Sequence, residues 1–282
     1  MAVAVNERGQ GPALMRLVAV AVLFALLHPT SSGTAPQPNG PGGTWNVIFA
    51  DEFSGLSLDK NKWSTCLWWG CTGAQGQTNV RHTAANVSVG SGTLALSARQ
   101  TAGSDASGSY DYTLGEIQSG RTSSDLSRPP KFSMLYGFAE ARIRVAGTYG
   151  FESGLWMSSA DGSWPPELDI AEILGKSSNM VNMAFHWRDA SATNNQDYTQ
   201  YVGPDFAGGW HTFGVDWEPT YIKWYVDGVA RKTYTDSNTI PQTAMDIRAN
   251  LDVGGPWISD PDSTTSWPGQ FDIDYIRAWR KP

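Results

Sequence analysis

Short extended segments dominate the pattern of this chain, and they limit the folds that are open to it. Runs of β-branched and aromatic residues recur along the 282 residues, each bounded by Gly, Asp, Asn or Ser, and long helical periodicity is absent. A chain of this length holds one large domain or two small ones, and neither a repeat nor a long linker divides it. The pattern therefore predicts an all-β sandwich in one domain.

The clearest strand patterns are spread over the whole chain. They lie at residues 45–49, 86–98 (a hairpin turning at Gly90-Ser91-Gly92), 117–122, 137–145, 149–157, 167–172, 180–187, 210–216, 221–226, 247–253 and 271–279. A further turn is predicted at Asp227-Gly228, because this dipeptide favours tight hairpins. Residues 101–109, rich in Ser, Gly and Ala, are expected to be mobile.

Three carboxylates crowd into the segment WPPELDIAE, residues 164–172. In a strand, Glu167 and Asp169 point to the same face, whereas strict alternation would turn Glu172 into the core. A lone buried carboxylate is costly, so we expect a β-bulge at residues 170–171 that returns Glu172 to the acidic face. One face of one strand would then carry all three acids, which indicates a site.

The residues around these acids favour carbohydrate chemistry. A solvated acidic face or a cation site with oxygen ligands would also use Glu and Asp. However, Trp164 and the two prolines after it exclude a helix leading in and put an aromatic ring at the edge of the acids. A flat apolar surface beside paired carboxylates suits a sugar ring and its hydrolysis. The next strand would bring His186 close, as a cleft residue or as a structural histidine.

The N-terminus has the pattern of a secretory signal. Basic residues precede the apolar stretch 17–27, and a small, polar run follows it. We therefore interpret residues 1–35 as a signal peptide, 36–43 as a Pro/Gly-rich lead-in, and 44–282 as a single catalytic domain. An uncleaved N-terminal anchor is the alternative.

One loop, residues 63–73, combines both cysteines with adjacent tryptophans. In a secreted chain, Cys66 and Cys71 are expected to form a local disulfide, and without nearby histidines they do not make a zinc site. Trp68 and Trp69 cannot both be buried easily in a loop, so at least one of them is expected to face a ligand. Asn86-Val87-Ser88, further along, matches an N-glycosylation sequon.

The order of motifs along residues 45–279 is similar to that of glycoside hydrolase family sixteen, the laminarinase and lichenase group. The resemblance is carried by DEF, GLWM, WPPELDIAE, FHW, DWEPTYIKWYVDG, NLDVGG and DIDYIRAW. The spacing of the acids resembles the β-1,3-glucanase branch. The resemblance implies a concanavalin-like β-jelly roll, a sandwich of two curved antiparallel sheets with a concave substrate cleft.

The resemblance also implies roles for individual residues. Glu167 would be the nucleophile, Asp169 its assisting neighbour and Glu172 the general acid/base, with no cofactor needed for catalysis. Asp274 matches a position that in many members helps to bind a structural calcium ion. The sugar contacts it implies are Trp156, Trp164, His186, Asn250 and Trp257.

Some positions depart from the family pattern. Glu152 stands where a cleft Trp is usual. At the lip of the cleft it would accept hydrogen bonds from sugar hydroxyls. The alternatives are that it faces solvent or pairs with a basic residue outside the cleft. Pro166 replaces the Gly usual before the nucleophile, and residues 70–82 do not follow the common pattern.

These features predict a secreted, extracellular, endo-acting hydrolase that cleaves β-1,3- or mixed-linkage β-1,3-1,4-glucan with retention. Alternatives are a hydrolase or transglycosylase acting on galactan or agar-type polysaccharide, and a non-catalytic carbohydrate-binding jelly roll. The net charge of −7 and the lack of a basic stretch argue against nucleic acid. We expect a monomer that binds polysaccharide and, once processed, no membrane.

Overall fold

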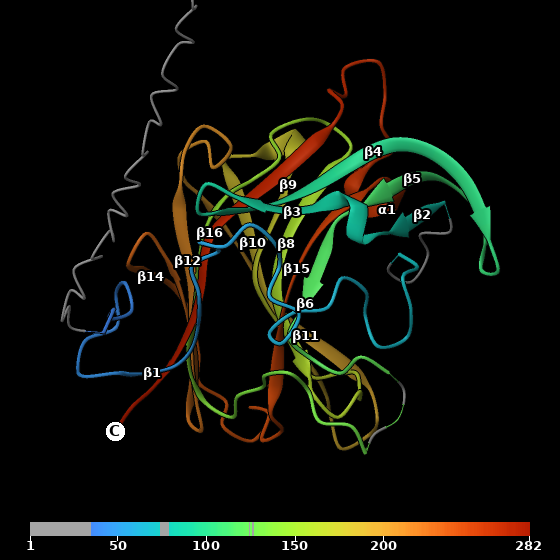
Figure 1. Cartoon of the computed structure of the whole chain (residues 1–282). Coiled ribbons are helices and arrows are strands. Elements are labelled where there is room, and N and C mark those ends of the chain that lie inside the picture. The colour runs from blue at the N-terminus through green and yellow to red at the C-terminus, as the bar shows by residue number, and fades with distance from the viewer. Residues whose placement is uncertain (1–34, 74–78, 124, 126) are drawn as a thin grey trace, which may run out of the picture. The chain divides into compact units, whose positions relative to one another are not determined.

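Two β-sheets face each other in the computed structural model, which describes residues 35–73, 79–123, 125 and 127–282 (Figure 1). The described residues form one unit from Ala35 to Pro282. The predicted signal segment, except for its last residue, lies outside the described residues. Within the part that is described, no helix is long and apolar enough to cross a membrane.

The larger sheet has the strand order β14-β13-β12-β7-β16-β4-β5-β2, with β1 paired to β16 and β3 to β4. Its pairs are antiparallel except β2–β5, which is parallel. In Figure 1, β4 and β5 curve away together as a long ribbon. The strands are β1 (Asn46–Asp51), β2 (Val80–His82), β3 (Val87–Gly90), β4 (Thr93–Asp105), β5 (Gly108–Leu114), β7 (Gly137–Arg144), β12 (His211–Glu218), β13 (Tyr221–Val226), β14 (Val229–Tyr234) and β16 (Gly269–Arg280).

The smaller sheet carries the predicted acids on β9, an inner strand. Its order is β11-β10-β9-β8-β15-β6, and all its pairs are antiparallel. The strands are β6 (Glu116–Gln118), β8 (Phe151–Ser159), β9 (Glu167–Leu174), β10 (Met180–Arg188), β11 (Asn194–Val202) and β15 (Met245–Val253). The described helices are single turns: η1 (Ala84–Asn86), η2 (Gly175–Ser177) and α1 (Gly255–Ile258). The all-β prediction is thus confirmed.

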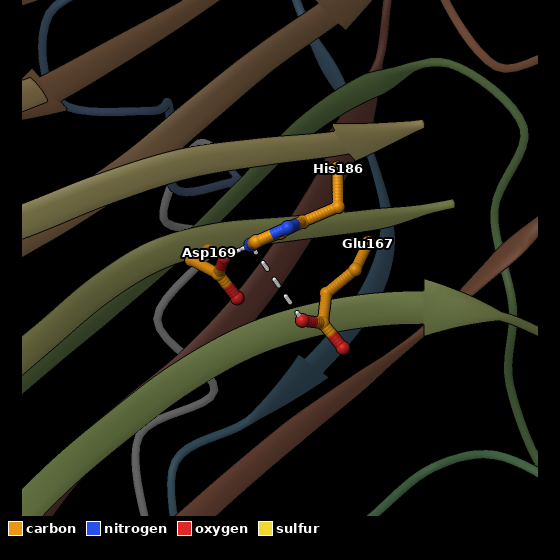
Figure 2. A group of neighbouring side chains, drawn as sticks. All are labelled: Glu167, Asp169 and His186. Atoms are coloured by element: carbon orange, nitrogen blue, oxygen red, sulfur yellow. Dashed lines mark hydrogen bonds and ion pairs between the residues drawn. The ribbon is translucent and has the colours of Figure 1, made fainter. Parts of the chain in front are cut away.

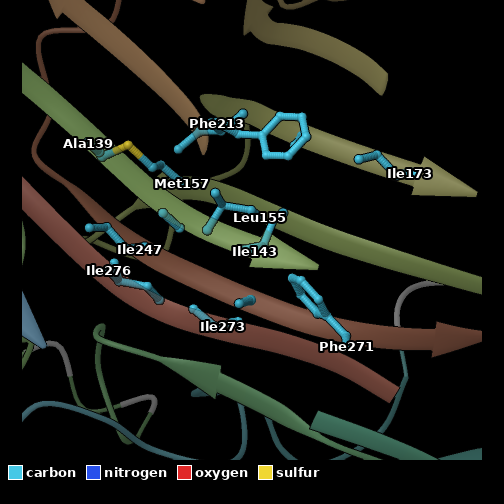
Figure 3. Packing of buried hydrophobic residues seen from close by; sticks show 14 of the residues in the cluster. Ala139, Ile143, Leu155, Met157, Ile173, Phe213, Ile247, Phe271, Ile273 and Ile276 are labelled. Carbon is cyan, nitrogen blue, oxygen red and sulfur yellow. The ribbon is translucent and has the colours of Figure 1, made fainter. Parts of the chain in front are cut away.

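The space between the sheets is filled by apolar side chains from both (Figure 3). Leu155 and Met157 of β8 and Ile247 of β15 point inward from the smaller sheet. Ile143 of β7 and Phe213 of β12 meet them from the larger sheet. All five are fully buried, so the inner face of the smaller sheet is committed to the core and its polar residues must point to the other face.

A β-bulge in β9 brings the third acid to that other face. Leu155 pairs with Ala171, but the next residue of β8, Trp156, pairs with Asp169, so Ile170 is the extra residue. The bulge falls where the sequence predicts it. Without it, every side chain after the bulge would point to the opposite face of the sheet.

The predicted hairpin turns are also present. Ser91-Gly92 and Asp227-Gly228 have positive φ at both positions, as tight antiparallel turns require. The expectation of a mobile tract at 101–109 is wrong as regards structure, because β4 and β5 pair with each other through most of it. Backbone pairing can hold a Ser/Gly/Ala segment in a ribbon that its side chains do not specify.

The structure bears on both the predicted disulfide and the glycosylation sequon. The predicted disulfide between Cys66 and Cys71 is formed. The sequon at Asn86, in contrast, is not available for glycosylation, because this side chain is buried and its Nδ2 donates to Thr113 Oγ1 at 3.1 Å.

The lead-in 36–43 has neither helix nor strand, yet it is bound to the outer face of the larger sheet. Trp279 Nε1 donates to the Pro36 carbonyl at 2.6 Å. The Asn39 backbone N–H donates to Glu140 Oε2 at 3.0 Å. Because the lead-in is bound to the larger sheet by these two contacts, it does not cover the polar face of the smaller sheet.

Candidate active site

The three acids follow one another along β9, an inner strand of the smaller sheet. On β10, His186 pairs with Glu167, Ala184 with Asp169, and Asn182 with Glu172. Directly opposed residues of an antiparallel pair point to the same face, so His186 belongs to the acidic face, as predicted. Figure 2 shows its ring directed at the two neighbouring carboxylates.

His186 links the first two acids. Its Nε2 lies 2.9 Å from Asp169 Oδ2 and 3.9 Å from Glu167 Oε1. Burial lowers the pKa of His186, against the opposing effect of Glu167. The ring is therefore neutral at neutral pH, and its Nε2 shares one hydrogen bond with the Asp169 carboxyl.

Asp169 is the most deeply placed of the three acids, with 3% of the residue exposed. Burial and the nearby Glu152 raise its pKa to about 8, while Lys232 acts in the opposite direction. Lys232 comes from β14 of the larger sheet and is itself buried, with its Nζ bound to the carbonyls of Met183 and Asp197. A cation thus reaches the back of the acidic face through the core.

Glu167 is held from the solvent side by Trp164, whose Nε1 donates to Glu167 Oε2 at 3.2 Å. Burial and the neighbouring Asp169 raise the pKa of Glu167 to about 8. His186, Trp164 and Arg248 oppose that shift, because they favour the ionised carboxylate.

The pKa of Glu172 is raised as well, and few groups around it oppose the shift. Burial, then Asp169 and Glu167, raise its pKa well above the ordinary value of 4.5. Carboxyl groups crowded in a site of low dielectric constant cannot all be ionised at once. As the pH rises, Glu172 and its buried neighbours are therefore the last to lose their protons. Glu167 is the acid surrounded by groups that favour its charge.

Two hollows meet at Glu167. One, of about 650 Å³, lies towards β8 and β15 and has Trp68, Trp69, Trp156, Trp164 and Arg248 in its lining. The other, of about 510 Å³, lies towards β10 and β11 and has Glu172, His186, Tyr198 and Trp257 in its lining. Glu167 lines both, so a chain laid through the two hollows would pass over the acids.

Comparison with known proteins agrees with this geometry. The family model for glycosyl hydrolases family 16 matches residues 74–277. The chain belongs to this family. Curated relatives include an endo-1,3-1,4-beta-glycanase, ExsH, of Rhizobium meliloti, with 30% identity over 82% of this chain and 51% of the relative. A beta-glucanase of Acetivibrio thermocellus is 30% identical over 83% of this chain and 63% of the relative.

A solved structure has the same fold. The laminarinase catalytic domain of Thermotoga maritima superimposes with a TM-score of 0.74 and 27% identity, over 85% of this chain and all of that domain. The chain spans about half to two thirds of the length of the two curated relatives above. The family 16 assignment and the jelly-roll fold predicted for it are thus established for this chain.

The predicted sugar contacts of this family 16 chain fall into two groups. Trp156 and Trp164 line one hollow, and His186 and Trp257 line the other. Trp164 and Trp257 are 48% and 46% exposed, which leaves their faces free for stacking.

Asn250 of β15, the fifth predicted sugar contact, lies beside Trp156 and lines neither hollow. It is buried, accepts a hydrogen bond from Trp156 Nε1 at 2.7 Å and donates one to Asp252 Oδ2 at 3.1 Å. The direct sugar contact predicted for it is therefore not favoured. Its contacts orient the indole of Trp156 instead.

Glu152 is not at the lip of the cleft. Only 7% of it is exposed, it lines neither hollow, and it is hydrogen-bonded to Glu172. The predicted contact with sugar hydroxyls and both alternatives, a solvent-facing side chain and a pair with an outside base, are therefore wrong. The strand register explains this, since Glu152 lies two residues from Gly154, which is opposite Glu172.

Asp274 does not fit the calcium site expected of it. Its Oδ2 lies 2.7 Å from Arg142 Nη1, and a guanidinium at that distance repels a second cation. Among the described residues, the side chains that converge closely enough for one ion are Glu167, Asp169 and His186, all within 4.8 Å. These three are the residues that the cation-site alternative would use.

Several residues of the site were missed from the sequence. Arg248, its guanidinium 4.7 Å from the Trp156 ring centroid, is buried beside Asp246 with a 2.6 Å contact. Tyr198 comes from β11, a strand that the sequence analysis did not place. The alternation of polar and apolar residues in DIRANLDV, 246–253, was the available signal for the buried row on β15.

Proposed function

We propose that this chain is a secreted, retaining endo-β-glycosidase that cleaves β-1,3- or mixed-linkage β-1,3-1,4-glucan. The observation that carries the proposal is the position of Glu167 and Glu172 on one face of β9, where two aromatic-lined hollows meet. A hydrolase that cuts inside a polymer needs room for sugar units on both sides of its acids. The two hollows supply it.

The reaction proceeds by two displacements at the anomeric carbon. Ionised Glu167 attacks that carbon while Glu172 gives its proton to the departing glycosidic oxygen, which leaves a glycosyl ester on Glu167. Esterification removes the charge of Glu167, so Glu172, now ionised, loses a repelling neighbour. It then takes a proton from water as the water attacks the same carbon and releases Glu167.

Asp169 and His186 assist without bond making of their own. His186 fixes the Asp169 carboxyl through the 2.9 Å contact, and Asp169 lies between the two reacting acids along β9. A carboxyl fixed beside Glu167 raises the pKa of the nucleophile and limits the space into which its side chain can turn.

The substrate class rests on the relatives and on the lining of the hollows. The relatives named above are endo-1,3-1,4-beta-glycanase, beta-glucanase and laminarinase. Trp68, Trp69 and Trp164 beside the first hollow offer flat apolar surfaces to neutral sugar rings. Galactan and agar-type polymers, and transglycosylation to a sugar acceptor, are alternative outcomes of the same chemistry.

Release of reducing ends from laminarin, mixed-linkage glucan, galactan and agarose tests the proposal. We expect the two glucans to be cleaved with internal cuts, seen as an early fall in viscosity. The matched control is Glu167→Gln, which keeps the size of the side chain and removes the nucleophile. Binding of oligosaccharide without cleavage by the wild type would support the carbohydrate-binding alternative instead.

Secretion, the monomeric state and polysaccharide as the partner are parts of the same proposal. The N-terminal order of basic, apolar and small residues supports cleavage near residue 35. N-terminal sequencing of the protein exported by a bacterial host would locate the cut, and an uncleaved product in the membrane fraction would support the anchor instead.

A further inference from the structure

Glu152 lies behind Glu172 in a pocket of acids that the proposed reaction does not use. Gly154 is opposite Glu172 on the neighbouring strand, and a Cβ there would come within 2.9 Å of Asn250 Oδ1. Because Gly154 has no side chain, the Glu172 carboxyl has room to reach Glu152, which lies two residues from Gly154 on β8. The two are hydrogen-bonded to each other.

A hydrogen bond between two carboxyl groups requires a proton, because ionised carboxylates are acceptors only. Burial, together with the charges of Glu172 and Asp252, raises the pKa of Glu152 well above 4.5. Glu152 has an acid on either side, since Asp252 is opposite it on β15 and Glu172 lies diagonally from it on β9. A proton on Glu152 relieves the repulsion from both neighbours, so Glu152 is the donor and Glu172 the acceptor.

A buried row of charges fixes the other side of Glu152. Asp252 is opposite Glu152 on β15, and Asp252 Oδ1 lies 3.3 Å from His82 Nε2. His82 Nδ1 lies 2.8 Å from Glu116 Oε2. Burial lowers the pKa of His82, but Glu116 and Asp252 outweigh it and raise that pKa to about 10. The charge of Asp252, which lies between His82 and Glu152, in turn favours the protonated form of Glu152.

We propose that Glu152 is a positioning residue that stays protonated through the catalytic cycle and donates its O–H to Glu172. The inference rests on the proposed role of Glu172. Before the first step both carboxyls carry a proton. Glu172 gives its proton to the leaving oxygen, and the resulting carboxylate accepts a charge-assisted hydrogen bond from Glu152. Water returns a proton to Glu172 in the second step, while the proton of Glu152 does not move.

Several titratable groups face this pair and enter its pH dependence. They are Glu167 and Asp169 on β9, His186 on β10, Tyr198 on β11, Asp252 on β15, and, behind Asp252, His82 on β2 and Glu116 on β6.

The test compares two neutral replacements of the same length. Glu152→Gln keeps an N–H donor towards Glu172, and Glu152→Met keeps only the volume. We expect Glu152→Gln to hold kcat close to wild type, and Glu152→Met to lose about 10- to 100-fold in kcat with little change in KM, within the range of general acid–base effects. Without the donor the pKa of Glu172 rises, so the alkaline limb of the Glu152→Met profile moves to higher pH.

The outcomes separate this inference from the proposed function. Equal losses in both variants, with an unchanged pH profile, would reduce Glu152 to a packing residue. A large loss in Glu152→Gln alone would mean that Glu152 acts as an ionised carboxylate. Either result, beside an active wild type and an inactive Glu172→Gln, overturns the inference and leaves the proposed function standing.

Infrared spectroscopy gives a measurement that needs no activity. The difference spectrum of wild type minus Glu152→Gln at neutral pH should contain the C=O stretch of a protonated carboxyl group. Glu52→Gln, which removes an exposed partner of Arg277, is the matched control and should lack this C=O band. A carboxylate band alone from Glu152 would overturn the proposal even in a protein without activity.

Discussion

The Nε2 atom of His186 lies 2.9 Å from Asp169 Oδ2, across the β9–β10 pair and at the centre of the acidic face. This contact satisfies an acid that is almost fully buried. Removing it leaves Asp169 without its nearest donor, next to the residue proposed to attack the substrate.

We therefore expect His186→Ala to lower kcat by about 10- to 100-fold, the scale of a lost positioning hydrogen bond to a buried acid. His186→Gln retains an N–H donor and should recover part of the loss. Reducing-sugar release at saturating glucan measures both variants, with circular dichroism to check folding. Full activity of His186→Ala would contradict the role given to this histidine.

Trp164→Phe tests the hydrogen bond to the proposed nucleophile. The ring remains for stacking, but the Nε1–H that favours ionised Glu167 is lost. The pKa of Glu167 should rise, so the acidic limb of kcat/KM moves to higher pH. Since Trp164 is half exposed, we expect a loss of about 2- to 10-fold in kcat/KM, or about 0.5–1.5 kcal/mol. An acidic limb that stays in place would separate Trp164 from the ionisation of Glu167.

The pH profile of the wild type follows from the shifts at the two reacting acids. Glu167 must be ionised, so activity falls as the pH drops through its raised pKa. Glu172 must be protonated, so activity falls again as the pH rises through its own raised pKa. Both limbs of kcat/KM should lie above pH 4.5, the ordinary value for glutamate. An acidic limb below that value would contradict the environment described for Glu167.

Folding stability should respond to the same buried proton. The folded-state pKa of Glu152 is raised, so the native state binds a proton that the unfolded chain releases above about pH 4.5. This contribution is fully present below that pH and is lost as the pH rises, by up to about 1.4 kcal/mol per pH unit. Glutamine needs no proton, so the Tm of Glu152→Gln should exceed that of wild type more at pH 8 than at pH 5. Equal differences at the two pH values would contradict it.

Much of the site could be predicted from the sequence because its signal is local. The spacing of Glu167, Asp169 and Glu172 implies the bulge, since no other register keeps all three out of the core. The nearness of His186 follows from the hairpin order. These inferences need only strand periodicity and the cost of burying charge.

The rest depended on pairs that are distant in the chain. In the sequence, Glu152 resembles a cleft residue. Its environment is set by Asp252 of β15 and His82 of β2, and no spacing along the chain indicates that these residues lie near it. Asn250 was expected to touch sugar, and its side chain is hydrogen-bonded to Trp156 and Asp252, two partners that the spacing does not indicate. Asp274 was expected to bind calcium, and its partner Arg142 comes from a strand 132 residues away.

The central claim is the double displacement by Glu167 and Glu172, and the stereochemistry of the first product tests it most directly. Two acids that act as nucleophile and acid/base from one face give net retention at the anomeric carbon. Proton NMR of an early digest of laminarin, recorded before mutarotation, reads that configuration. We predict that the β-anomer appears first and the α-anomer only later. An α-anomer as the initial product would contradict the assignment of Glu167 as nucleophile.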